Sequence, residues 1–138
     1  MVQEIDYLLL GQAKEYYSKL GYIYKETPWY VPIDVILLTT IKENAISIDK
    51  DKNLVGSAEQ SFLDLAIKNK LIENINYHSI NPCFRNELPD DFHHPYFIKL
   101  ELFNLNSDNI FNKFLEDAYN LYKIFSKKIL SIENTLKL

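Results

Sequence analysis

Two apolar, β-prone runs on either side of a short polar loop constrain the fold of this chain more than any other feature. The first run covers residues 81–87, the loop covers residues 88–94, and the second run covers residues 95–103. Two such runs in close succession are typical of a β-hairpin. The sequence therefore predicts an antiparallel hairpin with an extended loop.

Three side chains of this hairpin form a candidate binding site. Arg85 and Glu87 are two residues apart, so on a strand they project from the same face, and Phe97 lies on the returning strand. An arginine could bind a phosphate, a phenylalanine the face of a ring, and a glutamate an amino group. A cross-strand salt bridge on a half-exposed sheet is the alternative, and residue chemistry alone favours it.

The order of residues in the hairpin supports the binding site. Phe-Arg-Asn-Glu at 84–87, followed by a loop and Phe-Ile-Lys-Leu-Glu at 97–101, resembles motif 2 of the class II aminoacyl-tRNA synthetases, most closely the seryl, threonyl and prolyl subgroup. The resemblance implies that Arg85 is a catalytic residue on the α-phosphate of ATP or an adenylate. It also implies that Glu87 binds the adenine amino group and that Phe97 lies over the adenine ring.

A second part of the resemblance precedes the hairpin. Residues 54–59, Leu-Val-Gly-Ser-Ala-Glu, resemble the Thr-x-Glu loop of the same subgroup, with Ser57 in place of threonine. The resemblance implies that Ser57, Glu59 and Glu101 bind the substrate, with Glu59 on the ammonium group of an amino acid. Ser57 followed by Gln60 also has the pattern of a capping box, which makes Glu59 a favourable acid in the first turn of a helix. Both interpretations can hold together.

The N-terminal segment has the order helix, glycine, strand and proline. Apolar residues recur at helical spacing over residues 3–20, Gly21 ends the helix, and residues 22–25 form a short strand before Pro28. This order resembles motif 1 of the same synthetases, which builds their dimer interface, and it implies a homodimer formed through residues 3–28. An ordinary amphipathic helix packed on a sheet is the alternative.

The remaining segments alternate strands with helices. The apolar run at residues 29–41 is a buried strand or a short helix, and its length does not decide between them. The other expected elements are a strand at 45–49, a turn at 50–53, a strand from Leu54, a helix from Ser57 to about Lys70, and a last helix opened by Ser107 and Asp108. Together they predict an α+β fold, with an antiparallel β-sheet flanked by helices. We expect a single domain over residues 1–138 that corresponds to a reduced class II synthetase core.

Composition narrows the classes of partner. A chain of 138 residues with 47% hydrophobic content is long enough and apolar enough to build a packed core. The net charge of −4 argues against strong nonspecific nucleic-acid binding, which depends on phosphate contacts. One cysteine, an acidic N-terminus unlike a signal peptide, and the lack of a bilayer-length apolar run indicate a cytoplasmic protein without membrane contact.

The hairpin loop contains side chains of metal-ligand type. They are Asp90, Asp91, His93 and His94. Adjacent loop residues rarely converge on one ion, and no further His or Cys cluster in the sequence supports them. The sequence therefore predicts no metal site built from these side chains.

Motif 3 of the same synthetases, a glycine-rich strand and helix, has no counterpart after the hairpin. The glycines are Gly11, Gly21 and Gly56, so the resemblance implies a core truncated before motif 3 and its γ-phosphate arginine. The favoured hypothesis is a dimeric synthetase paralogue with a binding or regulatory role that retains part of an ATP or aminoacyl-adenylate pocket. The alternative is a minimal adenylate-forming ligase that activates an amino acid for transfer to tRNA or a carrier protein. The expected ligands are ATP or an adenylate, Mg²⁺ and an amino acid, and the expected partners are tRNA or another protein.

Overall fold

The computed structural model describes residues 4–86 and 93–125. The chain divides into two compact units, the first ending at Leu105 and the second beginning at Asn106. Each unit is described by itself. No helix in the described part of the chain combines the length and the apolar character needed to cross a membrane.

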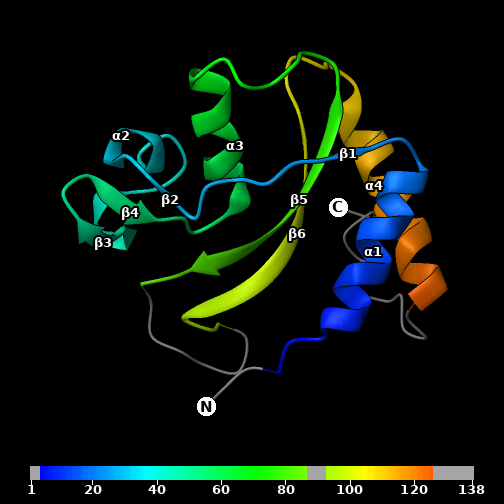
Figure 1. The fold of residues 1–138 in the computed structure, drawn as a ribbon, viewed down its shortest axis with the longest axis horizontal. Helices are drawn as coiled ribbons and strands as arrows, with labels where there is room; N and C mark the ends of the chain where they lie inside the picture. The colour runs from blue at the N-terminus through cyan, green and yellow to red at the C-terminus, as the bar shows by residue number, and fades with distance from the viewer. Residues whose placement is uncertain (1–3, 87–92, 126–138) are drawn as a thin grey trace. The chain divides into compact units, whose positions relative to one another are not determined.

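The main sheet of the first unit has three strands. They are β1 (Ile23–Tyr24), β5 (Asn76–Phe84) and β6 (Tyr96–Asn104), in the order β1-β5-β6 (Figure 1). β5 and β6 form the predicted antiparallel hairpin in continuous register, with Asn81 opposite Lys99. β1 runs parallel to β5, a pairing between segments that are far apart in the sequence.

A second, smaller sheet is built from segments that lie between β1 and β5 in the sequence. It contains β2 (Tyr30–Val31), β3 (Ile46–Asp49) and β4 (Lys52–Leu54), all antiparallel, in the order β2-β4-β3. The predicted turn at 50–53 is too long, because β4 already begins at Lys52. Asp51, with a φ of 50°, provides the left-handed turn residue between the two strands.

The apolar run at residues 29–41, predicted as either a buried strand or a short helix, contains one of each. Tyr30 and Val31 form β2, and α2 (Ile33–Ile36) follows directly. Pro32 is the N-cap of α2 with extended backbone angles, so it separates strand from helix. Val31 and Ile36 then pack with Val55 in one buried apolar cluster.

The first helix, α1 (Tyr7–Lys19), begins later than its apolar spacing predicted. Asp6 is the N-cap, and its Oδ1 accepts a hydrogen bond from the Leu9 backbone N–H at 2.9 Å. This cap fixes the start of the helix, since it satisfies a backbone N–H that has no partner within the helix. The predicted stop is confirmed, because Gly21 follows the helix with a φ of +96°.

The helix α3 (Ala58–Ile67) is capped by Ser57, as predicted, but its capping box is displaced by one residue. Ser57 Oγ accepts a hydrogen bond from the Glu59 backbone N–H at 3.2 Å. Gln60 Oε1 accepts from the Gly56 backbone N–H at 2.8 Å, where a capping box would use the backbone of Ser57. The consequence is that Gln60 fixes the loop just before the helix.

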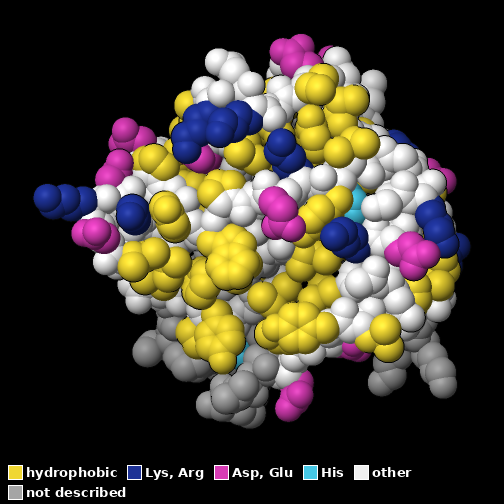
Figure 2. Space-filling model, in the orientation of Figure 1, with side chains coloured by type: hydrophobic (Ala, Val, Ile, Leu, Met, Phe, Trp, Pro, Cys, Tyr) yellow, Lys and Arg dark blue, Asp and Glu magenta, His cyan; other side chains and the backbone are white. Residues whose placement is uncertain are grey.

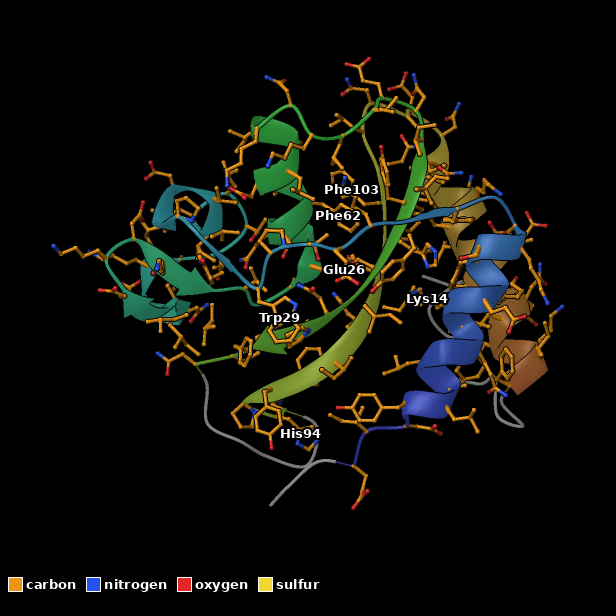
Figure 3. The ribbon with its side chains drawn as sticks, viewed as in Figure 1. Lys14, Glu26, Trp29, Phe62, His94 and Phe103 are labelled. Atoms are coloured by element: carbon orange, nitrogen blue, oxygen red, sulfur yellow. The ribbon has the colours of Figure 1, made fainter. Side chains whose placement is uncertain are left out.

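The two faces of the β5–β6 hairpin are covered differently. On the face beneath α3, Phe62 stacks on Phe103 with ring centres 4.8 Å apart (Figure 3). On the opposite face, His78 is fully buried and contacts the Tyr17 ring of α1, with ring centres 5.9 Å apart. We refer to these as the α3 face and the α1 face. The sheet is therefore flanked by helices, which confirms the predicted α+β fold.

Polar side chains are buried on the α3 face. Thr27 Oγ1 donates to Asn81 Oδ1 at 2.9 Å and shares a hydrogen bond with Ser79 Oγ at 3.0 Å. Asn81 Nδ2 donates to Ser61 Oγ at 3.2 Å, and Ser61 Oγ donates to the Pro28 carbonyl at 2.6 Å. These five residues form the Thr27–Asn81 network, which joins the segment after β1, the strand β5 and the helix α3.

The described part of the second unit contains one long helix, α4 (Ile110–Phe125). Ser107 and Asp108 precede it, as the sequence predicted. Its Lys113 and Asp117 form an ion pair at 2.9 Å with the i,i+4 spacing that stabilises helices.

Candidate functional site

A cleft of about 340 Å³ lies next to the end of β5 and the start of α3. Its lining is more polar than a hydrophobic core and contains charges of both signs. The lining residues are Ile36, Thr39, Thr40, Asn44, Ala45, Leu54, Gly56, Ser57, Glu59, Gln60, Phe84, Arg85, Asn86 and Lys99. A concave surface with a few convergent polar groups is the usual form of a small-molecule site.

Arg85 follows the last residue of β5 and has three contacts that fix its position. Its backbone N–H donates to the Pro95 carbonyl at 2.8 Å, which continues the hairpin. Its side-chain Nε donates to the Gly56 carbonyl at 2.8 Å, and its Cζ lies 5.3 Å from the centre of the Phe97 ring. The guanidinium is therefore anchored through Nε and by a cation–π contact, while its terminal nitrogens can serve an anion.

Ser57 and Glu59 reach the cleft from the N-terminus of α3. Ser57 Oγ is half-buried and lies 3.2 Å from Lys99 Nζ, which donates to it. The Glu59 side chain is exposed and lines the cleft. A carboxylate and a hydroxyl here are suited to an ammonium group, whereas the helix N-terminus itself favours an anion.

Lys99 is a cleft residue to which the sequence assigned no role. Its Nζ pairs with Glu101 Oε2 at 2.6 Å, and both side chains are only partly exposed. The signal was present in the sequence, because Phe97, Lys99 and Glu101 alternate along one strand and must share a face. The ion pair leaves this part of the cleft close to neutral.

The predicted site residues fall into three groups. Arg85, Ser57 and Glu59 line the cleft. Of the described residues, Phe97 and Glu101 do not line it, but each contacts a residue that does, Phe97 through Arg85 and Glu101 through Lys99. Glu87 lies outside the described residues.

The opposite wall of the cleft was not predicted as functional. Gln60 Nε2 donates to Thr39 Oγ1 at 2.7 Å, so the residue that fixes Gly56 also ties α3 to the segment after α2. Asn86 Nδ2 donates to the Glu43 carbonyl at 3.1 Å. No local pattern could reveal these contacts, since each joins segments distant in the sequence.

Two titratable groups in the same hairpin have shifted pKa values. Burial raises the pKa of the Cys83 thiol, which is fully buried on the α3 face. Burial, and secondarily the positive charge of Lys14, lowers the pKa of His78 to about 4. Both groups are therefore uncharged near neutral pH, and neither contributes charge to the cleft.

The described residues do not form a metal centre. Among residues 4–86 and 93–125, no group of three or more His, Cys, Asp or Glu side chains converges. The donor set of the cleft therefore fits a phosphate through Arg85 better than it fits Mg²⁺, which prefers carboxylate oxygens.

Comparison with known proteins shows a likeness in structure. No protein-family model matches the chain, and no curated protein sequence matches it. Two solved structures of pyrrolysyl-tRNA synthetase from Desulfitobacterium hafniense are similar. One has a TM-score of 0.67 and 16% sequence identity over 83% of this chain, and the other has a TM-score of 0.65 and 20% identity over 82%.

The chain spans less than half of these structures, covering 43% and 44% of their lengths. Pyrrolysyl-tRNA synthetase is a class II aminoacyl-tRNA synthetase. At this level of identity the likeness concerns the fold. The chain therefore has the fold of part of a class II aminoacyl-tRNA synthetase catalytic domain.

Proposed function

We propose that this chain is a dimeric binding or regulatory protein that retains part of an ATP or aminoacyl-adenylate pocket. The observation that carries the proposal is that Arg85, Ser57 and Glu59 line one cleft. Arginine is the side chain best suited to a phosphate, and a carboxylate beside a hydroxyl suits an ammonium group. An aminoacyl adenylate contains both of these groups.

The sequence of the α3 cap supports a seryl, threonyl or prolyl type of amino-acid site. Ser57, Ala58 and Glu59 stand where that subgroup has Thr-x-Glu, and Ser57 keeps the hydroxyl. Lys99 adds a cation next to Ser57, and Glu101 balances its charge. We propose that this group of side chains selects the amino-acid part of the ligand.

Binding is favoured over catalysis because few described groups can neutralise a triphosphate. Stabilising the charge on transferred phosphoryl groups needs several cations or metal ions. The described cleft has Arg85 and the already paired Lys99, and no converging carboxylates for Mg²⁺. We therefore propose that ATP and AMP bind with similar strength, because the α-phosphate contact of Arg85 is common to both.

The alternative function is a minimal adenylate-forming ligase. It is favoured by the same cleft, because a phosphate ligand and an amino-acid ligand would have to lie side by side there for an adenylate to form. Such an enzyme would pass the amino acid to tRNA or to a carrier protein. Partners of the binding protein would likewise be tRNA or another protein.

The deciding experiment combines calorimetry with pyrophosphate exchange. Titration with AMP and with ATP plus Mg²⁺ should give weak and similar affinities for the purified chain. Exchange of labelled pyrophosphate into ATP should remain at background with a mixture of amino acids. Exchange above background would establish the ligase instead, and a lack of heat with both nucleotides would contradict the retained pocket.

We also propose a homodimer through residues 3–28. Large apolar side chains are exposed in this segment, and Tyr7 and Leu8 are 71% and 74% exposed. Hydrophobic side chains are also exposed in groups on the face of the molecule seen in Figure 2. Two adjacent large apolar side chains that are this exposed, Tyr7 and Leu8, suit a surface that binds another protein copy.

A further inference from the structure

Arg85 is the only arginine in the sequence, and its side chain lies directly against the Gly56 backbone. Its Nε donates to the Gly56 carbonyl at 2.8 Å. A Cβ on Gly56 would lie 3.7 Å from Arg85 Nε and 3.8 Å from Arg85 Cδ, so the two residues are in close contact. The position of the guanidinium therefore depends on where the Gly56 carbonyl points.

The direction of the Gly56 carbonyl is set by the peptide group that precedes it. Glycine by itself fixes little, because it tolerates more backbone angles than any other residue. The peptide group between Val55 and Gly56 is held at both ends. The Val55 carbonyl accepts from the Phe84 N–H at 2.9 Å, and the Gly56 N–H donates to Gln60 Oε1 at 2.8 Å. Since a peptide group is planar, these two bonds fix its plane, and only the backbone torsions of Gly56 separate that plane from the carbonyl that binds Arg85.

Gln60 is itself a well-fixed anchor for this peptide. Its side chain is buried, with 3% of its surface exposed, and both ends of its amide have a partner. A backbone N–H can only donate, so Oε1 faces Gly56, and Nε2 therefore donates to Thr39 Oγ1 at 2.7 Å. A buried amide that is bonded at both ends has little freedom to rotate. Gln60 therefore transmits its own fixed position to the Gly56 backbone.

These contacts give Gln60 a role in the phosphate site, although it acts through another residue. On the basis of the phosphate site proposed above, we propose that Gln60 is the positioning residue of Arg85. It holds the Gly56 peptide so that the Gly56 carbonyl meets Arg85 Nε and keeps the guanidinium in the cleft. An arginine that is held in place before the ligand arrives loses less conformational freedom on binding, so it binds a phosphate more tightly than a mobile one.

The same hydrogen bonds connect the two walls of the cleft. Thr39 belongs to the wall opposite Arg85, and both residues line the cleft. Three bonds in series join them, from Thr39 to Gln60, from Gln60 to Gly56 and from Gly56 to Arg85. We refer to this series as the Thr39–Arg85 relay. A change in the Thr39 hydroxyl should therefore alter the position of Arg85 on the other side of the cleft.

Nuclear magnetic resonance can observe this arginine directly. With a single arginine in the sequence, a ¹H–¹⁵N spectrum contains one arginine Nε–H signal, which belongs to Arg85. Gln60→Met keeps the length of the side chain but offers the Gly56 N–H no oxygen. We expect the Arg85 signal of this variant to shift and its Nε–H to exchange with water severalfold faster, because the bond to Gly56 opens more often. A folded Gln60→Met variant with an unchanged signal and exchange rate would overturn the proposal.

Ser61→Ala is the matched control for the loss of a buried polar group. Ser61 is the next residue of α3, is fully buried, and donates to the Pro28 carbonyl at 2.6 Å. It belongs to the Thr27–Asn81 network and not to the Thr39–Arg85 relay. Ser61→Ala should therefore leave the Arg85 signal in place. Equal shifts in Ser61→Ala and Gln60→Met would mean that α3 loosens as a whole, which would also overturn the proposal.

Two further variants decide the question even if Gln60→Met does not fold. Gln60→Glu keeps an oxygen for the Gly56 N–H, and the Thr39 hydroxyl can donate to its second oxygen, so this variant should retain the signal of the parent chain. Thr39→Val, at an exposed position, removes the acceptor of Gln60 Nε2. It should shift the Arg85 signal and speed its exchange, by less than the loss of the Gln60 oxygen would. An unchanged signal in Thr39→Val would overturn the relay.

Calorimetry with AMP tests whether the position of Arg85 matters for binding. Gln60→Met should weaken AMP binding roughly two- to tenfold, the range expected when one long side chain must be ordered on binding, and Ser61→Ala should leave it unchanged. An unchanged affinity in a variant whose arginine signal has moved would overturn the role of Gln60 in binding. If AMP gives no heat with the parent chain, the proposed pocket is wrong, whereas the arginine signal still decides whether Gln60 positions Arg85.

Discussion

The guanidinium of Arg85 lies over the ring of Phe97, with Cζ 5.3 Å from the ring centre, while Nε is bonded to the Gly56 carbonyl. One face of the Phe97 ring is therefore occupied by Arg85. A nucleobase that stacks on Phe97 from this side must displace the guanidinium. If the nucleotide also binds Arg85 through a phosphate, the displacement and the new contact can take place together.

Arg85→Ala should weaken AMP binding by roughly tenfold or more. A charge-assisted hydrogen bond contributes about 1.5–3 kcal/mol, and about 1.4 kcal/mol corresponds to tenfold. Arg85→Lys should lose most of the affinity as well, because lysine has neither the planar fork nor the stacking contact with Phe97. Calorimetry with AMP is the measurement. Lys113→Ala, in the second unit, is the control, and an equal loss there would contradict a site at Arg85.

Gly56→Ala should destabilise the protein by up to about 1 kcal/mol. A Cβ at this position would lie 3.4 Å from the Phe84 carbonyl oxygen and 3.7 Å from Arg85 Nε, at the close limit of ordinary van der Waals contact, so the added methyl group leaves the Arg85 side chain little room to adjust. Gly11→Ala is the matched control, because no atom lies within 4 Å of its Cβ and alanine favours the interior of α1. That change should stabilise the protein by about 0.5–1 kcal/mol. Urea unfolding of both variants measures the two effects, and stabilisation by Gly56→Ala would show that the loop is loosely packed.

Thr27→Val should reduce the free energy of unfolding by about 1–3 kcal/mol. The substitution preserves the shape of the side chain but removes the hydroxyl that donates to Asn81 Oδ1, which leaves a buried acceptor without its donor. Thr40→Val is the control, since Thr40 accepts its hydrogen bond from Asn44 at an exposed position. Similar effects of the two changes in urea unfolding would mean that the Thr27–Asn81 network adds little stability.

The buried His78 should make the stability of the first unit depend on pH. Its pKa of about 4 in the folded protein lies below the usual value of 6.5. The unfolded chain therefore takes up the proton first as the pH falls. The contribution of His78 to the free energy of unfolding is fully present above about pH 6.5. It is lost as the pH falls from about 6.5 to 4, with a decrease on the order of 2 kcal/mol at pH 5.

The variant His78→Phe isolates this contribution. It keeps an aromatic ring among Tyr17, Tyr22 and Tyr24 but cannot take up a proton. Unfolding in urea at pH 7.5 and pH 5 should show a smaller difference for the variant than for the parent. An equal difference in both would assign the pH dependence to other groups.

The homodimer through residues 3–28 predicts a loss of association when its exposed apolar surface is changed. Leu8→Glu should raise the dissociation constant by tenfold or more, because a charge replaces an apolar side chain at a buried contact. Ile48→Glu, at a position in β3 that is also exposed (56%, against 74% for Leu8), should have no effect. Analytical ultracentrifugation measures both constants. A mass of 16.3 kDa at every concentration for the parent chain would contradict any dimer.

The local sequence pattern was sufficient to predict the β5–β6 hairpin, the N-cap at Ser57 and the end of the first helix at Gly21. In each case the determining residues are neighbours in the sequence, so periodicity and turn chemistry contain the information. The same is true of Lys99, whose place on the strand follows from Phe97, although no role was assigned to it.

Other features depend on contacts between distant segments and could not be predicted from the sequence. Gln60 was expected only to complete the cap of its own helix, but beside its bond to the neighbouring Gly56 it donates from Nε2 to Thr39, 21 residues away in the sequence. Likewise, no pattern in the sequence of either strand predicts the parallel pairing of β1 with β5. Such contacts are decided by which backbone groups remain unsatisfied after the local elements have formed.

The parallel pairing of β1 with β5 also affects the order in which the chain folds. Thr27 and Ser79, which this pairing brings together, are 52 residues apart in the sequence, whereas β5 and β6 are neighbours. Closing the longer loop costs more entropy, so we expect the hairpin to form before α1 and β1 dock. During synthesis, β1 leaves the ribosome before β5 and must wait for β5 to emerge. Of these strands, β1 is therefore made before β5 and β6 but is paired after them.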